Sequence, residues 1–395
     1  MNKWVWLLFL IFILSGCAAK SELDEIAIVL GMGVDITNDN KTEVTVQVAN
    51  PRSSPNVVSG GSGDGSSPVF TFSAKGDSVT DAINRVKNVV PRELFFSHIN
   101  VMMLGEKYAR KEGVSEIFSY VERDQELRSQ FPLFVIKDST GKEALTVVTP
   151  LDQFPTKAIL DIVELSSGYI GVKKTVRIND LINWEGEEDR TPIILGLEVM
   201  AKDKNKNTGA LQDIEAYAFK LDSMGVFKNG KFLKWLNEET ATGWLFMNDY
   251  VEERTLHTVE CEGGTFGIML KGVSSDINTD VKNNQLLIDI TIQGTSSLVS
   301  SSCKADIASP EGINELEQTL RKIVEQEVKK AVYETVELKT NYNGLAARFH
   351  RQHPDKWKKW KKNWYEHIED STLHIKSELT IETPGMRYNS AKTQR

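Results

Sequence analysis

The sequence lacks an apolar run long enough to cross a bilayer as a helix. Its longest such run, Trp4 to Leu14, has 11 residues and would form a helix of about 16 Å, whereas the hydrocarbon core of a bilayer is about 30 Å thick. Lys3 precedes the run and small residues follow it, which is typical of a cleaved secretion signal. The sequence therefore predicts a secreted body with a processed N-terminus.

Cysteine is scarce, with Cys17, Cys261 and Cys303 as the three examples among 395 residues. Three cysteines cannot build the dense disulfide framework of a small secreted domain, so the fold must depend on hydrophobic cores. The chain is long enough for two or three of them. Cys261 and Cys303 could pair in an oxidising compartment, but pairing depends on their distance in the fold, and both alternatives stay open here.

Positive charge is in deficit, because 47 Lys and Arg face 55 Asp and Glu, which gives a net charge of −8. Removal of the signal deletes Lys3 and makes the mature chain more acidic by one charge. Nucleic acid requires clustered Lys and Arg, so we expect no nucleic-acid partner. An acidic body also repels anionic lipid headgroups, so surface charge cannot be what attaches this protein to a membrane.

The short motifs of catalysis and cofactor binding are absent or incomplete. The sequence has no G-x-S-x-G elbow and no H-E-x-x-H zinc motif. Gly31-Met32-Gly33 lacks the third glycine of a dinucleotide loop. Gly225 to Lys231 spells G-x-x-x-x-G-K, but Phe232 stands where a Ser or Thr must bind magnesium. We therefore expect no enzyme, no catalytic residue, no metal site and no cofactor.

The residues that end the signal carry one chemical feature. Leu14, Ser15 and Gly16 stand directly before Cys17, an order that resembles a bacterial lipobox. In such a motif the cysteine thiol takes a diacylglyceryl group and the peptide bond before it is cut. Each buried methylene of an acyl chain contributes about 0.8 kcal/mol, so two chains hold a protein firmly to a bilayer. We predict a signal peptide over 1–16 and lipid attachment at Cys17.

The first part of the mature chain mixes hairpins, strands and helices. Residues 26–50 read as a hairpin, and 51–68 as a flexible loop rich in Gly, Ser and Pro. Helical spacing from Val79 to Val90 follows a capping Asp77 or Ser78. Strand-like 98–104, helical 107–123 and strand-like 131–137 then alternate. The pattern predicts an α+β domain over 17–201.

The remainder divides at a polar stretch that begins at Lys202. Asn229-Gly230 is the strongest short hairpin signal, and we expect a small middle domain over 202–262. Long strands follow over 264–300 with a turn at Asn283-Asn284, then a long amphipathic helix that begins at Pro310 and a strand over 371–383. These elements predict a C-terminal α+β domain over 263–395, with an antiparallel sheet and long helices.

The most unusual stretch is ARFHRQHPDKWKKWKKNW, at 347–364. In a helix from Pro354, its three tryptophans lie on one face and most of its lysines on the other. One interpretation is a basic aromatic surface that contacts a membrane or an acidic partner. The alternative, which we favour, buries the tryptophans in the core and leaves the lysines in water. The residues assigned to the contact interpretation are Trp357, Lys358, Lys361 and Lys362.

This stretch, followed by a strand and TPGM, resembles the C-terminal signature of the Ger(x)C family, the C subunits of spore germination receptors. Other segments agree in order, among them ELDEIAIVLGMGVDIT, LFFSHINVMMLGEKYARKEGV and AYAFKLDSMGVFKNGKFLKWLNEETATGWLF. Cys17 matches the lipidated cysteine of the family. Ala18-Ala19-Lys20 departs from the Trp-Asp and basic residues that members often carry there.

The resemblance implies a non-enzymatic, lipid-anchored subunit of a nutrient germinant receptor in the spore inner membrane, on the outer face of the cytoplasmic membrane. It implies A- and B-type integral-membrane subunits as partners. It also implies an α+β fold of three mixed α/β domains with largely antiparallel sheets. Only Cys17 inherits a chemical role, since the family has no assigned catalytic residues. A lipid-anchored binder of small molecules outside the cytoplasm is the alternative function.

Overall fold

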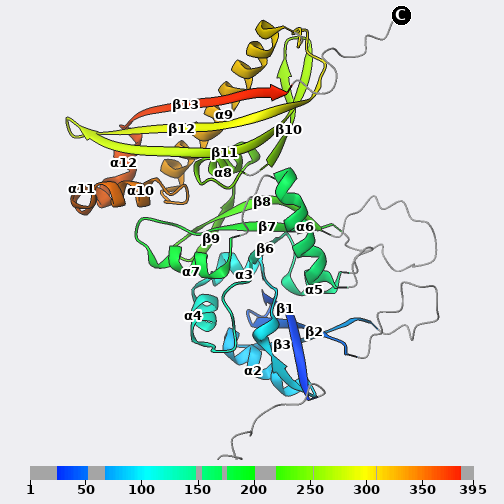
Figure 1. Ribbon diagram of the computed structural model, residues 1–395. Helices are drawn as coiled ribbons and strands as arrows, with labels where there is room; N and C mark the ends of the chain where they lie inside the picture. Colours follow the sequence, from blue (N-terminus) through cyan, green and yellow to red (C-terminus); the bar gives the residue numbers. More distant parts are fainter. Residues whose placement is uncertain are drawn as a thin grey trace, which may run out of the picture.

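The computed structural model describes residues 25–51, 67–147, 154–170, 176–200, 219–251, 253–307 and 309–383. In these residues the chain forms two β-sheets with helices packed on and between them (Figure 1). The first sheet holds most strands of the N-terminal half, and the second contains the four strands that follow residue 252. The α+β class expected from the sequence is confirmed.

The first sheet has the order β3-β2-β1-β5-β6-β7-β8-β9, with the short β4 beside the start of β1. Its strands are β1 (Ile26–Ile36), β2 (Thr42–Ala49), β3 (Val69–Gly76), β4 (Glu93–Phe95), β5 (Val101–Gly105), β6 (Leu133–Lys137), β7 (Ile193–Val199), β8 (Phe219–Lys228) and β9 (Lys231–Trp235). Both ends of this order are antiparallel hairpins, as the alternating sequence pattern predicts.

The centre of this sheet corrects the expectation of largely antiparallel pairing. β1, β5, β6 and β7 are parallel neighbours. Parallel neighbours need a crossover, which helices supply here. These helices are α3 (Glu106–Lys111) and α4 (Ser115–Arg123) before β6, and α5 (Gly141–Thr146), α6 (Pro155–Ile170) and α7 (Ile178–Gly186) before β7. The parallel strands are almost wholly buried, which explains their continuous apolar sequence.

The helical segment expected over 107–123 is two helices, α3 and α4, because the chain turns at Gly113. Its φ of +86° lies in the left-handed region that favours glycine. A Cβ atom at this position would lie 2.2 Å from the backbone oxygen of Gly230. Val114 N–H donates to that same oxygen at 2.8 Å, so the turn is fixed against the β8–β9 hairpin.

The second sheet has the order β10-β11-β12-β13. Its strands are β10 (Glu253–Cys261), β11 (Gly264–Lys282), β12 (Gln285–Ser301) and β13 (Thr372–Thr383). The first three pair antiparallel, whereas β13 is parallel to β12 because a long helical connection joins them. That connection comprises α9 (Pro310–Leu338), α10 (Leu345–Gln352), α11 (Pro354–Trp360), the 3-10 turn Lys361–Asn363 and α12 (Trp364–Glu369).

Several predicted helix starts and turns are confirmed. Helix α2 (Val79–Val89) begins after Ser78, whose side chain accepts a hydrogen bond from Asp81 N–H. Helix α9 begins at Pro310 after the cap Ser309, and its apolar stripe is buried. Asn229 and Gly230 have positive φ angles in the β8–β9 turn. Asn283 and Asn284 do the same between β11 and β12.

Residues 202–262, expected to form a small middle domain, contribute to both sheets. β8 and β9 extend the first sheet, and β10 begins the second. Between them, α8 (Glu238–Met247) is buried along most of its length and packs on α9, β8 and β11. α8 therefore joins the two parts of the molecule, and the domain boundaries at 201 and 262 stay predictions.

Candidate functional site

A pocket of about 440 Å³ lies where three parallel strands of the first sheet end. β1, β5 and β6 are neighbours that all run in the same direction, so their carboxyl ends meet at one edge. The residues at and after these ends line the pocket, among them Asp35, Glu106, Arg110, Thr140 and Glu143. Ligands of α/β proteins commonly bind at such an edge. The pocket is therefore a candidate solute site.

Asp35 forms the floor of this pocket and is only 3% exposed. Its two carboxylate oxygens accept the N–H groups of Gly141 at 2.7 Å and Lys142 at 2.9 Å, at the start of α5. Burial nevertheless raises the pKa of Asp35 to about 6, because desolvation outweighs these hydrogen bonds. A Cβ atom at Gly105 would lie 2.3 Å from Asp35 Oδ1, so β5 needs glycine there.

Glu106 and Arg110 form the wall of the pocket, and both are engaged in hydrogen bonds within the protein. One oxygen of Glu106 accepts from Arg110 Nε at 2.8 Å and Nη2 at 2.6 Å. The other accepts Asp138 N–H and Trp235 Nε1–H, both at 3.2 Å. The Arg110 guanidinium also lies over the Phe232 ring, 4.3 Å from its centre. These contacts hold α3 to β9 and to the start of the loop after β6.

The tryptophans of 347–364 lie in the core. Trp357, Trp360 and Trp364 are 3%, 6% and 1% exposed. All three surround Phe349, at centroid distances of 6.5, 5.4 and 4.9 Å respectively. The core alternative is thus confirmed, and the contact interpretation is wrong for Trp357, because a buried ring offers no surface to a partner.

The lysines of the same stretch are exposed, as expected. Lys358 Nζ lies 3.1 Å from Asp355, and Lys361 Nζ lies 2.6 Å from Glu188 in the loop after α7. Lys361 thereby holds the pKa of the Glu188 carboxyl below its usual value. Partner or membrane contact by Lys358, Lys361 and Lys362 stays a prediction.

That loop after α7 is also where the two parts of the molecule meet. Asp189, 8% exposed, pairs with His350 Nδ1 at 2.5 Å, and the His350 ring stacks on Trp357. Asn341 and Thr191 exchange two hydrogen bonds, at 3.0 and 3.4 Å. These hydrogen bonds hold α10 and the segment after α9 against the loop that precedes β7. His350 therefore has a structural role at this contact.

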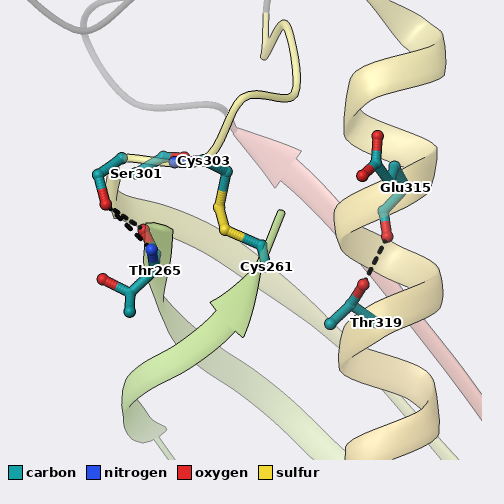
Figure 2. Close-up of a disulfide and its surroundings, with 7 residues drawn as sticks. Cys261, Thr265, Ser301, Cys303, Glu315 and Thr319 are labelled. Carbon is teal, nitrogen blue, oxygen red and sulfur yellow. Dashed lines mark hydrogen bonds between the residues drawn. A yellow bond between two sulfur atoms is a disulfide. The ribbon is translucent and has the colours of Figure 1, made fainter. Parts of the chain in front are cut away.

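Cys261 and Cys303 form a disulfide, with Cα atoms 5.7 Å apart. Figure 2 shows how it joins the end of β10 to the segment that follows β12. Beside it, Ser302 Oγ bonds both the N–H and the C=O of Thr265. The sequence left this pairing open, because the antiparallel strands that bring the two cysteines together are visible only in the fold.

Two motifs set aside in the sequence have structural roles. Gly31-Met32-Gly33 lies inside β1, between β2 and β5, rather than in a loop that could bind phosphate. Gly225 to Lys231 forms the β8–β9 hairpin. No group of three or more His, Cys, Asp or Glu side chains in the described residues could hold a metal ion.

Cys17, the predicted lipid site, lies outside the described residues. Within them, no helix combines the length and apolarity that a membrane span requires. Asp35, by contrast, is a site residue that sequence reasoning missed. Its signal was a lone carboxylate at the end of the apolar run IAIVLGMGVDI. Such a residue either ends a strand in water or is held by backbone donors, as it is here.

Two family models match this chain in order. The model for the spore germination protein N-terminal domain matches residues 19–199, and that for the spore germination B3/GerAC-like C-terminal region matches 222–385. Together they span most of the sequence.

Full-length relatives agree. Spore germination protein KC of Bacillus subtilis (strain 168) is 24% identical over 99% of this chain and 97% of its own. Spore germination protein B3 of the same organism is 22% identical over 92% and 93%. The fold is similar to the crystal structure of the GerBC protein, with a TM-score of 0.54 and 18% identity over 88% of this chain and 96% of that one. The chain therefore belongs to the GerAC-like family of spore germination proteins.

Proposed function

We propose that this protein is a lipid-anchored, non-enzymatic subunit of a nutrient germinant receptor, which acts with A- and B-type integral-membrane subunits to trigger spore germination. The observation that carries the proposal is similarity along the whole chain to proteins named for spore germination. Because the likeness spans both family regions, it supports the role of a complete subunit rather than of a shared module.

We place the anchor at Cys17 and the body on the outer face of the spore inner membrane. Two acyl chains on one residue supply firm attachment, and Glu25, the first described residue, is only eight residues further along. The extended reach of that segment is at most about 30 Å, so the body stays close to the bilayer. The Cys261–Cys303 disulfide supports a location outside the cytoplasm, since disulfides persist in oxidising compartments.

Confinement at a membrane also supports action by protein contact. A tether raises the effective concentration of neighbouring subunits, so interfaces of modest affinity suffice. The charged groups at the pocket wall, Glu106 and Arg110, are engaged by the fold rather than by a substrate. We infer that signals pass through the surfaces of this subunit.

A second candidate function is capture of a small polar solute. The 440 Å³ pocket between β1, β5 and β6 favours it, because its size suits an amino acid or a sugar. Calorimetric titration of the purified chain with amino acids and sugars separates the two functions. Saturable binding that is lost in Ser139→Trp, which places a bulky ring in the pocket lining, would support capture; the receptor-subunit proposal predicts no such heat.

The test of the main proposal uses spores of the host. Cys17→Ala should weaken membrane association, most clearly in spores that lack the A and B subunits, because the acyl chains are the proposed anchor. Nutrient-triggered germination should fall with it, while germination by a trigger that bypasses receptors stays normal. Firm membrane association of Cys17→Ala in spores that lack the A and B subunits would overturn the anchor. Unchanged nutrient germination in spores that lack the whole protein and any paralogue would overturn the receptor role.

A further inference from the structure

Strand β13 forms one edge of the second sheet, with β12 on its inner side (Figure 1). The backbone groups on its outer side have no neighbouring strand within the described residues. Such an edge is a template on which another extended chain can pair, and proteins commonly cover it. The contacts that cover part of β13 show which of its backbone groups could still pair with another chain.

Helix α9 covers the second half of this edge with three side chains spaced four residues apart. The bonds join Glu317 Oε1 to Ile381 N–H at 2.8 Å, Arg321 Nε to Leu379 C=O at 2.9 Å, and Glu325 Oε1 to Ser377 N–H at 3.0 Å. Four helical residues rise about 6 Å and two strand residues about 6.6 Å, so the helix and strand stay in step. The alternation of acid and base matches the alternation of N–H and C=O along the edge.

This series ends before it reaches the start of the strand. The next two steps along α9 are Lys329 and Tyr333, which come opposite Ile375 and Leu373. In the described part of the chain no side chain bonds the outer backbone groups of these two strand residues. Lys329 Nζ instead lies 5.9 Å from the centre of the Tyr333 ring, and Tyr333 is 40% exposed. A hollow of about 330 Å³ lies between helix and strand at this point.

The lining of the hollow has more positive than negative side chains. Lys322, Glu325 and Lys329 are its charged residues. Glu325 already accepts Ser377 N–H, while neither lysine is paired with a carboxylate of the described residues. The apolar lining consists of Tyr333, Leu373 and Ile375. An open backbone edge beside apolar side chains and two lysines fits an extended segment that alternates apolar and acidic residues.

We propose that this half of the β13 edge, at Leu373 and Ile375, binds an extended acidic segment of a partner protein by strand addition. The segment pairs its backbone with β13, rests apolar side chains on Tyr333 and brings carboxylates to Lys322 and Lys329. A second copy of this chain is a poorer occupant, since symmetric pairing brings the same lysines of both copies together. The inference rests on the proposed function only in taking the partner to be a protein.

The test uses the detergent-solubilised full chain and a fluorescent heptapeptide of alternating glutamate and valine, with blocked ends. Anisotropy should show saturable binding. The double variant Lys322→Glu/Lys329→Glu should lower the affinity by about tenfold or more, through loss of charge complementarity. Lys359→Glu, an exposed lysine on α11, is the matched control and should bind normally. A peptide N-methylated at its alternate amides should bind about tenfold more weakly, because it cannot pair with the edge.

Each opposite outcome overturns part of this picture. Equal binding of the methylated peptide would leave only charge attraction and exclude strand addition. Equal binding by the double lysine variant would place the peptide elsewhere. Edge-to-edge dimers in sedimentation that Ile375→Pro abolishes would make a second copy the occupant. These measurements use the isolated chain, so their failure does not bear on the germination assay, nor does that assay bear on them. Thermal unfolding of each variant confirms that it is folded.

Discussion

In both sheets charged side chains satisfy backbone groups, but they do so to different extents. At the carboxyl edge of the first sheet, Asp35 accepts hydrogen bonds from backbone N–H groups. Glu106 accepts them from the side chains of Arg110 and Trp235. In the second sheet, charged side chains of α9 bond backbone groups in the second half of β13 but leave those of its first half without a side-chain partner in the described residues. A polar pocket can therefore have a structural role, whereas an incompletely covered strand is a surface with unused hydrogen-bonding capacity.

The two sheets are also stabilised by different interactions. Parallel strands buried between helices hold the first sheet together without a disulfide in the described residues. The second sheet, which has only four strands, also depends on the aromatic cluster around Phe349 and on the Cys261–Cys303 bond. We therefore expect the C-terminal part to be the more sensitive to single changes in its core, and the following predictions test this contrast.

The largest expected effect is that of Trp364→Ala. The side chain is 1% exposed, and its ring centre lies 4.9 Å from that of Phe349 and 5.4 Å from that of Trp357. Its removal leaves a cavity and should lower the free energy of unfolding by about 3 to 5 kcal/mol. Urea denaturation measures the loss. Tyr333→Ala, at an exposed aromatic residue, is the control and should change little; a near-normal midpoint for Trp364→Ala would refute the cluster as core.

The next effect is that of the disulfide. Its cysteines are 42 residues apart, so its loss should lower the unfolding free energy by about 3 to 4 kcal/mol on the chain-entropy model. The double variant Cys261→Ser/Cys303→Ser should behave like the reduced wild type. Reductant should shift the denaturation midpoint of the wild type and leave that of the variant unchanged. A wild type indifferent to reductant would mean that the bond does not support the second sheet.

The smallest effect concerns Asp35 and pH. Its pKa is raised from 3.8 to about 6 in the fold, so the folded state favours the protonated carboxyl. The stability that this preference contributes is fully present below about pH 3.8 and is lost as pH rises through 6. At about 1.4 kcal/mol per pKa unit the loss amounts to at most about 3 kcal/mol.

Asp35→Asn removes the ionisation and keeps the shape. Unfolding free energies of the wild type and the variant, measured between pH 4 and 7, should therefore converge or cross rather than run parallel. Parallel curves would show that Asp35 does not titrate in this window.

Local structure was predictable where one signal dominated. Pro310 marked the start of α9, and Asn229-Gly230 marked the β8–β9 turn, because helix starts and tight turns depend on a few neighbouring residues. The three tryptophans of 347–364 were also predicted to lie on one buried face, and they do.

Non-local pairing was not predictable. Nothing in TLHIKSELTIET reveals that β13 is parallel to β12, or that its edge meets α9. The pocket around Asp35 likewise arises only when β1, β5 and β6 lie side by side, although they are far apart in the sequence. Sequence periodicity indicates which face is buried, while the partner of that face depends on topology.

The central claim, a membrane-held subunit that acts through protein contacts, is tested most directly by purification from dormant spores. The tagged protein, extracted from spore membranes in mild detergent, should bring A- and B-type subunits with it in comparable amounts, as quantified by mass spectrometry. Recovery of the protein alone, with both other subunits present in the same membranes, would contradict the account.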